Sequence, residues 1–345
     1  MIHFSRFFAA AALTIMTLST TSLAVAQERL RIADSLPIGH YFSESGTKFW
    51  MQRVSELTGG AVTLEYFPAE QLGKAKDLLS LTRSGVVDIG YVVPSYISER
   101  MPLSAVAELP GSFKTSCAGT LAYYDLAEHG LLKTEEFEPN GVRILFALVT
   151  PPYQLFTSHQ KIEGLKSIAG LKLRTTGGAM DATVRWFQGI PVRMAAPDMY
   201  QSLSRGTVDG TLFPYASIIS YDLAGLTKFA TFGENFGSAV LTYVVSDARW
   251  KRLSPQIQDA LRTAGEEATR RACAAADASV LKDADRLRLQ GVTVEPLPAA
   301  DQPTMQAATD AVAKEWAANL DQRGKPGSAS LAAFTTSLKQ IDGGR

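Results

Sequence analysis

Residues 171–178 read Leu-Lys-Leu-Arg-Thr-Thr-Gly-Gly, a short alternating segment that ends in an arginine and two glycines. Alternation of leucine with Lys172 and Arg174 is typical of a β-strand, and the glycines allow a sharp turn that leaves backbone N–H groups free. Open α/β sheets bind their ligands at the carboxyl ends of strands. The segment therefore predicts an α/β fold in which Arg174 lies at a ligand-binding edge.

Strand and helix patterns alternate on both sides of this segment. In the first half, Ser43 is expected to cap a helix that ends at Gly59 and Gly60. The order βαβαβ predicts a layered α/β domain with a largely parallel sheet. The predicted strands are 30–33, 61–67, 86–93, 142–149, 171–175, 191–194, 208–213, 238–245 and 292–294, and the predicted helices between them are 73–83, 116–132, 180–187 and 198–204.

A long helical pattern follows, from Pro255 to about residue 289, with alanines and leucine at helical spacing. At 1.5 Å per residue such a helix spans about 50 Å, enough to run along two domains. Further helices are expected over 299–320 and after a Gly-Lys-Pro-Gly break at 324–327. With 345 residues, the chain is predicted to form two domains, one from 27–150 and 238–280 and the other from 151–237 and 281–345.

The composition is that of a globular protein: 46% of residues are hydrophobic, and 34 basic side chains balance 34 acidic ones. Without a basic field, nucleic-acid binding is not expected. The first residues contain Arg6, an apolar run over 7–18 and Ala24-Val25-Ala26, which is the pattern of a signal peptide cleaved after Ala26. The alternative is an uncleaved anchor, for which the apolar run is short. We therefore expect residues 1–26 to direct export to the periplasm.

Cys117 and Cys273 are the two cysteines of the chain. An exported protein with an even number of cysteines can form a disulfide. Two buried, unpaired thiols are the alternative, and the sequence leaves both open.

The chain lacks recognisable catalytic motifs. It contains no His-Glu-x-x-His, Gly-x-Ser-x-Gly, Cys-x-x-Cys or Gly-x-Gly-x-x-Gly pattern, and Gly73-Lys74 is followed by alanine rather than by Ser or Thr. We expect no catalytic residues, no bound metal and no cofactor.

Three linked motifs carry a family resemblance: Thr157-Ser158, residues 168–174 (Ile-Ala-Gly-Leu-Lys-Leu-Arg) and residues 200–210 (Tyr-Gln-Ser-Leu-Ser-Arg-Gly-Thr-Val-Asp-Gly). Together with Glu70-Gln71-Leu72-Gly73 and residues 250–255, they resemble the DctP-type solute-binding proteins of tripartite ATP-independent periplasmic (TRAP) transporters. The resemblance covers nearly the whole mature chain. It implies a two-lobed periplasmic binding protein fold, similar to type II, with crossing hinge strands and a long helix that spans both lobes.

The resemblance also implies that Arg174 anchors the carboxylate of the ligand, and a guanidinium matches a carboxylate in a bidentate fork. An ordinary ion pair with Asp181 or Asp198 is the alternative. Relatives that bind sialic-acid-type ligands carry a second arginine where this chain has Gln154. Some relatives that bind 2-oxoacids with a cation carry Glu-Trp where this chain has Leu212-Phe213.

These departures favour a monocarboxylate with an apolar or aromatic body. The aromatic side chains expected to enclose it are Phe213, Tyr215, Trp186 and Tyr200, with core packing as the alternative for each.

The first lobe offers contacts from loops that follow predicted strands: Tyr41, Ser95 and Tyr96. His40 has two interpretations, a neutral donor to the ligand or a group that caps the helix after it. Lys74 would pair with a second carboxylate of a dicarboxylate ligand, or it is simply exposed.

The sequence thus predicts a receptor, not an enzyme, that captures a small organic acid and delivers it to the small and large membrane subunits of a TRAP transporter. A binding protein that serves a membrane sensor is the alternative, and a two-lobed periplasmic enzyme is a third class. Which acid is bound and the oligomeric state are left open.

Overall fold

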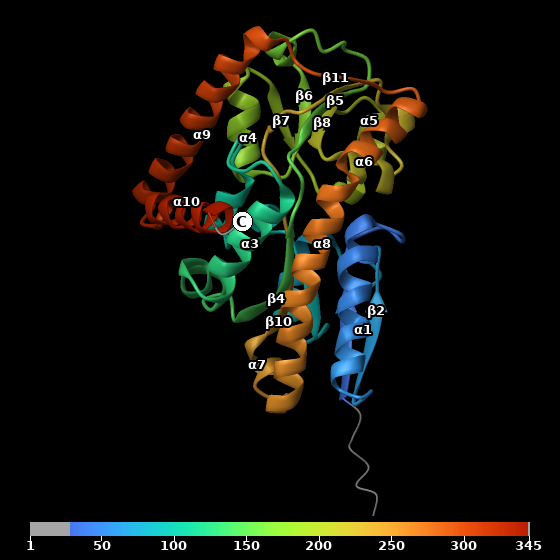
Figure 1. Ribbon diagram of the computed structural model, residues 1–345, viewed down its shortest axis with the longest axis vertical. Coiled ribbons are helices and arrows are strands. Elements are labelled where there is room, and N and C mark those ends of the chain that lie inside the picture. Colours follow the sequence, from blue (N-terminus) through green and yellow to red (C-terminus); the bar gives the residue numbers. More distant parts are fainter. Residues whose placement is uncertain (1–27, 344–345) are drawn as a thin grey trace, which may run out of the picture.

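The computed structural model describes residues 28–343 and contains two mixed β-sheets, one in each of two lobes (Figure 1). Sheet A of lobe I has the strand order β2-β1-β3-β10-β4. Strands β1, β2 and β3 are parallel, whereas β10 is antiparallel to both β3 and β4. The strands are β1 (Glu28–Ala33), β2 (Val62–Phe67), β3 (Ile89–Val92), β4 (Val142–Val149) and β10 (Val240–Ser246).

Sheet B of lobe II has the order β11-β9-β5-β8-β6-β7, in which β5 is antiparallel to both neighbours. Its strands are β5 (Gln154–Thr157), β6 (Lys172–Thr175), β7 (Ile190–Arg193), β8 (Gly210–Phe213), β9 (Phe229–Thr231) and β11 (Thr293–Glu295). The sequence analysis missed β5 and β9, which have only four and three residues.

Two strand-to-strand connections join the lobes, β4 to β5 and β9 to β10. They lie against each other: Thr150 N donates to Ala239 O (3.0 Å) and Tyr153 N donates to Gly237 O (2.8 Å). This paired ribbon explains the two antiparallel strands, because β5 and β10 each enter a lobe from the other one. The predicted two-lobed α/β fold with crossing strands is confirmed.

The helix predicted to begin at Ser43 starts two residues earlier. Helical turns begin at Tyr41 and pass through a π-helical segment (Ser43–Thr47) into α1 (Lys48–Leu57). Ser43 therefore lies inside the helix, and its predicted capping role is wrong; its hydroxyl instead accepts from the Tyr66 hydroxyl (3.2 Å). The other helices of lobe I are α2 (Leu78–Arg83), α3 (Ser116–Glu128) and α7 (Asp247–Trp250), with 3-10 turns η3 (Pro94–Ile97) and η4 (Leu103–Glu108).

Helix α8 (Pro255–Leu289) has 35 residues, and the Ser254 side chain caps it by accepting from Ile257 N. It packs on α1, α3 and β4 of lobe I and then on α6 and β11 of lobe II (Figure 1). Close packing is possible because Gly265 lacks a side chain: a Cβ there would lie 2.0 Å from Leu145 O. The predicted long helix along both lobes is confirmed.

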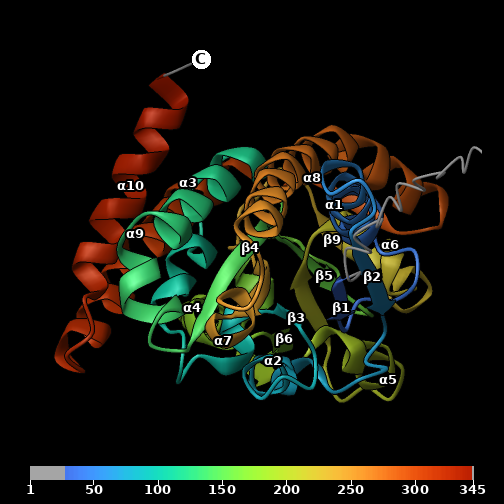
Figure 2. The ribbon, with the colours of Figure 1, turned by 90° about the horizontal axis from the view of Figure 1, so that it is seen from below.

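The helices beside sheet B are α4 (Gly178–Trp186), α5 (Met199–Ser204) and α6 (Tyr215–Ser220), and the chain ends in α9 (Gln302–Gln322) and α10 (Gly327–Gly343). Helix α9 packs on α4, whereas α10 packs on α3 of lobe I (Figure 2). The C-terminal helices thus contact both lobes, and the domain division inferred from the sequence stays a prediction. Residues 28–343 include no helix long and apolar enough to cross a membrane.

A disulfide joins Cys117 of α3 to Cys273 of α8, with the Cα atoms 4.7 Å apart. Next to it, the Asp277 carboxylate accepts from the backbone N of Ser116 (2.6 Å) and of Cys117 (2.9 Å) at the start of α3. The structure thereby decides between the two alternatives that the sequence left open.

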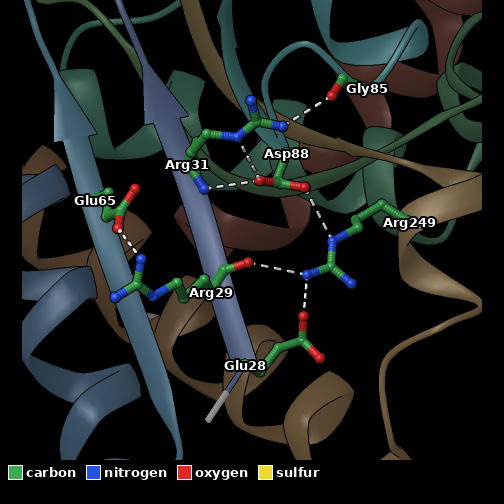
Figure 3. A network of polar contacts seen from close by, with 7 residues as sticks. All are labelled: Glu28, Arg29, Arg31, Glu65, Gly85, Asp88 and Arg249. Atoms are coloured by element: carbon green, nitrogen blue, oxygen red, sulfur yellow. Dashed lines mark hydrogen bonds and ion pairs between the residues drawn. The ribbon is translucent and has the colours of Figure 1, made fainter.

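Charged side chains hold the start of β1 (Figure 3). Asp88 accepts from the backbone N of Arg31 (2.8 Å), from its Nε (3.3 Å) and from Arg249 Nε (3.0 Å), while Arg249 also pairs with Glu28. These contacts tie β1, the residue before β3 and α7 together at one end of sheet A. Asp88 and Arg249 are only 12% and 11% exposed.

Candidate ligand-binding site

Arg174 lies near the end of β6 and is completely buried. Its Nε donates to Met194 O (3.1 Å) and its Nη2 donates to the Tyr96 hydroxyl (3.2 Å), whereas Nη1 has no hydrogen-bond partner. No carboxylate of residues 28–343 lies within ion-pair distance of it, so neither Asp181 nor Asp198 is its counter-ion; Asp181 pairs with Arg193 instead. A buried guanidinium with a free N–H and no counter-ion is arranged to receive an anion.

Phe213, at the end of β8, lies under Arg174: the guanidinium carbon is 5.2 Å from its ring centroid. The rings of Tyr153 and Tyr221 each lie 5.8 Å from Phe213, and His40 lies 5.5 Å from Tyr221 and 4.5 Å from Tyr41. These five rings, hereafter the aromatic cluster, extend from Arg174 in lobe II to the loop after β1 in lobe I.

Tyr96 and Ser95 belong to the 3-10 turn η3, immediately after β3. The Tyr96 hydroxyl accepts from Ala196 N (2.9 Å) as well as from Arg174, so it joins the two lobes. Gly177 approaches the same turn closely, because a Cβ there would lie 3.2 Å from Ser95 O; its φ of +105° also favours glycine. The lobes are therefore in contact at Arg174.

His40 shows one of its two predicted roles. Its Nδ1 accepts from Phe42 N (3.2 Å) at the beginning of the helix. Burial lowers the pKa of His40 to about 3, so the ring is neutral and carries its proton on Nε2. The Nε2–H group remains a donor beside Tyr41 and Tyr221.

The tyrosine hydroxyls of the site are also neutral, because burial raises the pKa of Tyr41, Tyr153 and Tyr221. Within residues 28–343, the buried Tyr41 hydroxyl has no hydrogen-bond partner of ordinary geometry. The cluster thus presents apolar ring faces with several polar ends, which is the usual composition of a small-molecule site.

A groove of about 530 Å³ between the lobes leads to this site; the residues on its walls include Ser95, Tyr96 and Thr176, whose Oγ1 is buried and unpaired. Lys74 lies on its rim and pairs with Glu70 (2.6 Å). Lys74 is therefore already neutralised within lobe I.

Four residues predicted from the sequence have side-chain contacts elsewhere than at Arg174, although Gln154 lies opposite Phe213 in the register of β5 and β8. The Gln154 amide is bonded to Glu234 O (2.6 Å) and Thr231 Oγ1 (3.0 Å), and the Tyr215 hydroxyl donates to Thr231 O (2.7 Å). Trp186 packs edge-on against its neighbour Phe187, and Tyr200 is 48% exposed on α5. No hydrogen bond or ring contact within the described part of the chain joins these four side chains to Arg174 or the aromatic cluster.

Tyr153 and Tyr221 of the aromatic cluster were not predicted from the sequence, and neither was the buried carboxyl group of Glu108. Tyr153 follows two prolines at the start of the first hinge segment, where the short strand β5 was not predicted. Tyr221 follows the unpredicted helix α6. Glu108 lies in the 3-10 turn η4 and is fully buried. Because none of these elements was recognised, no signal in the sequence pointed to these three residues.

No group of three or more His, Cys, Asp or Glu side chains within residues 28–343 could hold a metal ion. The arrangement is suited to an anion with an apolar body, which is the kind of site that a two-lobed solute-binding protein has. The family model of bacterial extracellular solute-binding proteins, family 7 (DctP), matches residues 39–319. The chain therefore belongs to the DctP family, whose role is to bind solutes for transport.

Relatives agree with this assignment. The chain is 28% identical over 273 residues to a solute-binding protein of Roseobacter denitrificans, covering 77% of this chain and 81% of the relative. It is 26% identical over 229 residues to the C4-dicarboxylate-binding periplasmic protein of Rhodobacter capsulatus, covering 65% and 67%.

Among solved structures, a TRAP periplasmic solute-binding protein of Bordetella bronchiseptica with bound (R)- and (S)-mandelate is similar with a TM-score of 0.81 and 27% identity, covering 91% of this chain and 99% of that one. A TRAP solute-binding protein of Rhodoferax ferrireducens with copurified benzoate has a TM-score of 0.84 and 23% identity, covering 90% and 98%. The second similarity concerns the fold.

Proposed function

We propose that this protein captures a small organic monocarboxylate with an aromatic or apolar body in the periplasm and delivers it to the small and large membrane subunits of a TRAP transporter. The observation that carries the proposal is the buried Arg174, which has an unpaired Nη1 and no carboxylate within ion-pair distance in the described chain. A ligand carboxylate removes the cost of that uncompensated charge.

The carboxylate accepts from Arg174 Nη1 and from the unpaired hydroxyl of Thr176, two residues further along the chain. Arg174 is held in place by Met194 O and the Tyr96 hydroxyl, so little side-chain entropy is lost on binding. Phe213 and the rest of the aromatic cluster enclose the body of the acid. Its neutral hydroxyls and rings suit a single-charged acid better than a sugar acid, and the mandelate bound by the Bordetella relative supports this class.

Binding and release require the lobes to open. The paired segments around Thr150 and Gly237 connect the lobes and form the hinge, while the Tyr96 contact to Ala196 belongs to the closed form. The closed, loaded form then docks on the membrane subunits. Export through a signal peptide cleaved after Ala26 is part of the proposal; residues 1–26 lie outside the described residues.

The test is a thermal-shift and calorimetry screen of the purified mature protein against benzoate, phenylacetate, mandelate, succinate and a neutral sugar. A ligand at a hundredfold its Kd adds about 2.7 kcal/mol of stability. We expect an aromatic monocarboxylate to bind and Arg174→Ala to weaken it at least a hundredfold. Arg143→Ala is the matched control, because Arg143 pairs with Asp247 (2.6 Å) at a partly exposed position.

Equal binding by wild type and Arg174→Ala, or a response to the sugar alone, contradicts the proposal. Recovery of the bound acid unchanged after incubation separates a receptor from an enzyme. Co-purification with the membrane subunits tests the delivery step.

A further inference from the structure

Glu108 is a fully buried carboxyl group where the hinge meets sheet A. Its backbone O accepts from Ser238 N (3.4 Å), and its Oε1 accepts from Val240 N (3.1 Å) at the start of β10. Its Oε2 has no hydrogen-bond partner within the described residues. Buried carboxyl oxygens are normally bonded, so an unpaired one calls for a partner that enters the site.

The polar group beside Glu108 is Ser95. Strand β10 pairs with β3 in the register Thr242 to Val92, and Ser95 lies in the 3-10 turn that follows β3. Ser95 is 3% exposed, and its hydroxyl lowers the pKa of Glu108 through a side-chain hydrogen bond, but the geometry of this contact leaves both Ser95 Oγ and Glu108 Oε2 without a hydrogen bond of ordinary geometry.

This pair belongs to the same site as Arg174. Ser95 precedes Tyr96, whose hydroxyl is bonded to Arg174. The positive charge of Arg174 lowers the pKa of Glu108. The pKa of Tyr153 responds to both groups, since Arg174 lowers it and Glu108 raises it. Glu108 and Ser95 both belong to lobe I, and Glu108 lies close enough to Arg174 for that charge to act on its carboxyl group.

We propose that Glu108 and Ser95 form a second polar subsite that takes a hydroxyl group on the body of the ligand, so that the protein selects hydroxylated acids over their unsubstituted parents. The inference rests on the proposed function and names the substrate class more closely.

A hydroxyl group fits this subsite for a chemical reason. It donates to an ionised carboxylate and accepts from a protonated one, so it satisfies Oε2 in either protonation state. An unsubstituted acid leaves Oε2 and the Ser95 hydroxyl with only their poorly aligned contact to each other, and a site that holds unsatisfied polar groups rejects such analogues. Burial raises the pKa of Glu108 to about 7, so both protonation states are relevant.

The experiment compares acids that differ by one hydroxyl: phenylacetate with mandelate, and benzoate with 3-hydroxybenzoate. Calorimetry at pH 7 gives Kd for wild type, Glu108→Leu, Glu108→Gln and Ser95→Ala. We expect wild type to bind at least one hydroxylated acid tenfold or more tightly than its parent. Glu108→Leu should reduce that ratio to threefold or less while the Kd of the parent acid changes less than threefold, and Glu108→Gln, which keeps a polar group, should retain most of the preference.

Ser95→Ala is the second variant, in case Glu108→Leu does not fold, and it should at least halve the preference. Glu136→Gln is the matched control: Glu136 is another buried glutamate, but its carboxyl is bonded to Ser104 N (2.9 Å) and Ser104 Oγ (2.6 Å). That variant should keep the wild-type ratio.

The outcomes are distinct. No hydroxyl preference in wild type, or a preference that survives both Glu108→Leu and Ser95→Ala, overturns the subsite. Equal loss of affinity for both acids of a pair in Glu108→Leu shows a structural role and also overturns it. Failure of every acid to bind, or binding that does not need Arg174, contradicts the proposed function itself.

Discussion

The Tyr96 hydroxyl accepts two hydrogen bonds from lobe II, one from Arg174 Nη2 at 3.2 Å and one from Ala196 N at 2.9 Å. One oxygen atom of lobe I thus orients the proposed carboxylate anchor and holds the lobes together. Because both donors belong to lobe II, the two bonds form only when the lobes close.

Tyr96→Phe should therefore weaken binding of the carboxylate by about tenfold, since each lost hydrogen bond is worth roughly 1 kcal/mol. The melting temperature of the ligand-free protein should change little. Calorimetry with the acid identified in the screen measures the effect, and an unchanged Kd would show that Tyr96 does not hold the closed form.

Gly237 in the second hinge segment should not tolerate a side chain. A Cβ at this position would lie 2.6 Å from Glu108 O, and its φ is +118°. Gly237→Ala should lower stability by about 1–3 kcal/mol, measured by urea unfolding. Gly233→Ala is the control, because its φ of +81° is also positive but no atom lies within 4 Å of a Cβ there; it should cost less. Equal losses would show that backbone strain alone matters.

The Asp88 network predicts a contrast between two neighbouring ion pairs (Figure 3). Asp88→Asn should cost about 1–3 kcal/mol, because the partly buried carboxylate serves Arg31 and Arg249 together. Glu65→Gln should cost less than about 0.5 kcal/mol, because its partner Arg29 is 73% exposed. Chemical unfolding of both variants checks this, and similar losses would contradict the assigned difference.

The disulfide should stabilise the folded protein because it lowers the conformational entropy of the unfolded chain. Cys117 and Cys273 are separated by 156 positions, and closing so long a loop is worth about 2–4 kcal/mol. The double variant Cys117→Ser with Cys273→Ser should melt at a lower temperature, and dithiothreitol should lower the melting temperature of wild type alone. Thiol titration checks that the reductant has fully reduced the disulfide. An unchanged melting temperature of the fully reduced wild type would contradict the prediction.

Glu108 should make stability depend on pH. Burial raises its pKa from 4.5 to about 7, so between these values the unfolded chain loses a proton that the folded protein keeps. The contribution of Glu108 to the free energy of unfolding is complete below pH 4.5 and is lost as pH rises to 7. The loss amounts to at most about 3 kcal/mol. Of the neighbouring charged groups, Arg174 opposes the shift and Glu136 reinforces it.

His40 acts in the opposite sense: its lowered pKa gives a contribution that is complete above pH 6.5 and is lost as pH falls toward 3. The effect of Glu108 is therefore isolated by comparing a Glu108 variant with wild type at each pH. Glu108→Gln should gain stability relative to wild type as pH rises from 4.5 to 8, measured by urea unfolding in steps of pH. A difference that does not change with pH would contradict a raised pKa of Glu108.

The elements that the sequence predicted well have strong local signals. Strand β4 has the predicted bounds, Val142–Val149, because eight mostly apolar residues follow a turn. Helix α8 begins at the predicted Pro255, because Ser254 caps it and proline favours the first turn. The missed strands β5 and β9 are too short to show a period, and hydrogen bonds from neighbouring strands of sheet B define them.

The sequence by itself determined the alternating α/β elements, the long helix and the position of Arg174 near the end of a strand, since periodicity and local turn chemistry specify these features. Its motifs, through the family resemblance, also implied the two lobes. The tertiary structure decided the pairing of Cys117 with Cys273, the closure contact of Tyr96 with Ala196, and the meeting of His40, Tyr153 and Tyr221 around Phe213. It also gave the side chains of Gln154 and Tyr215 hydrogen-bond partners within lobe II. These contacts join residues far apart in the chain, and they depend on how two lobes and a hinge pack, which no local pattern encodes.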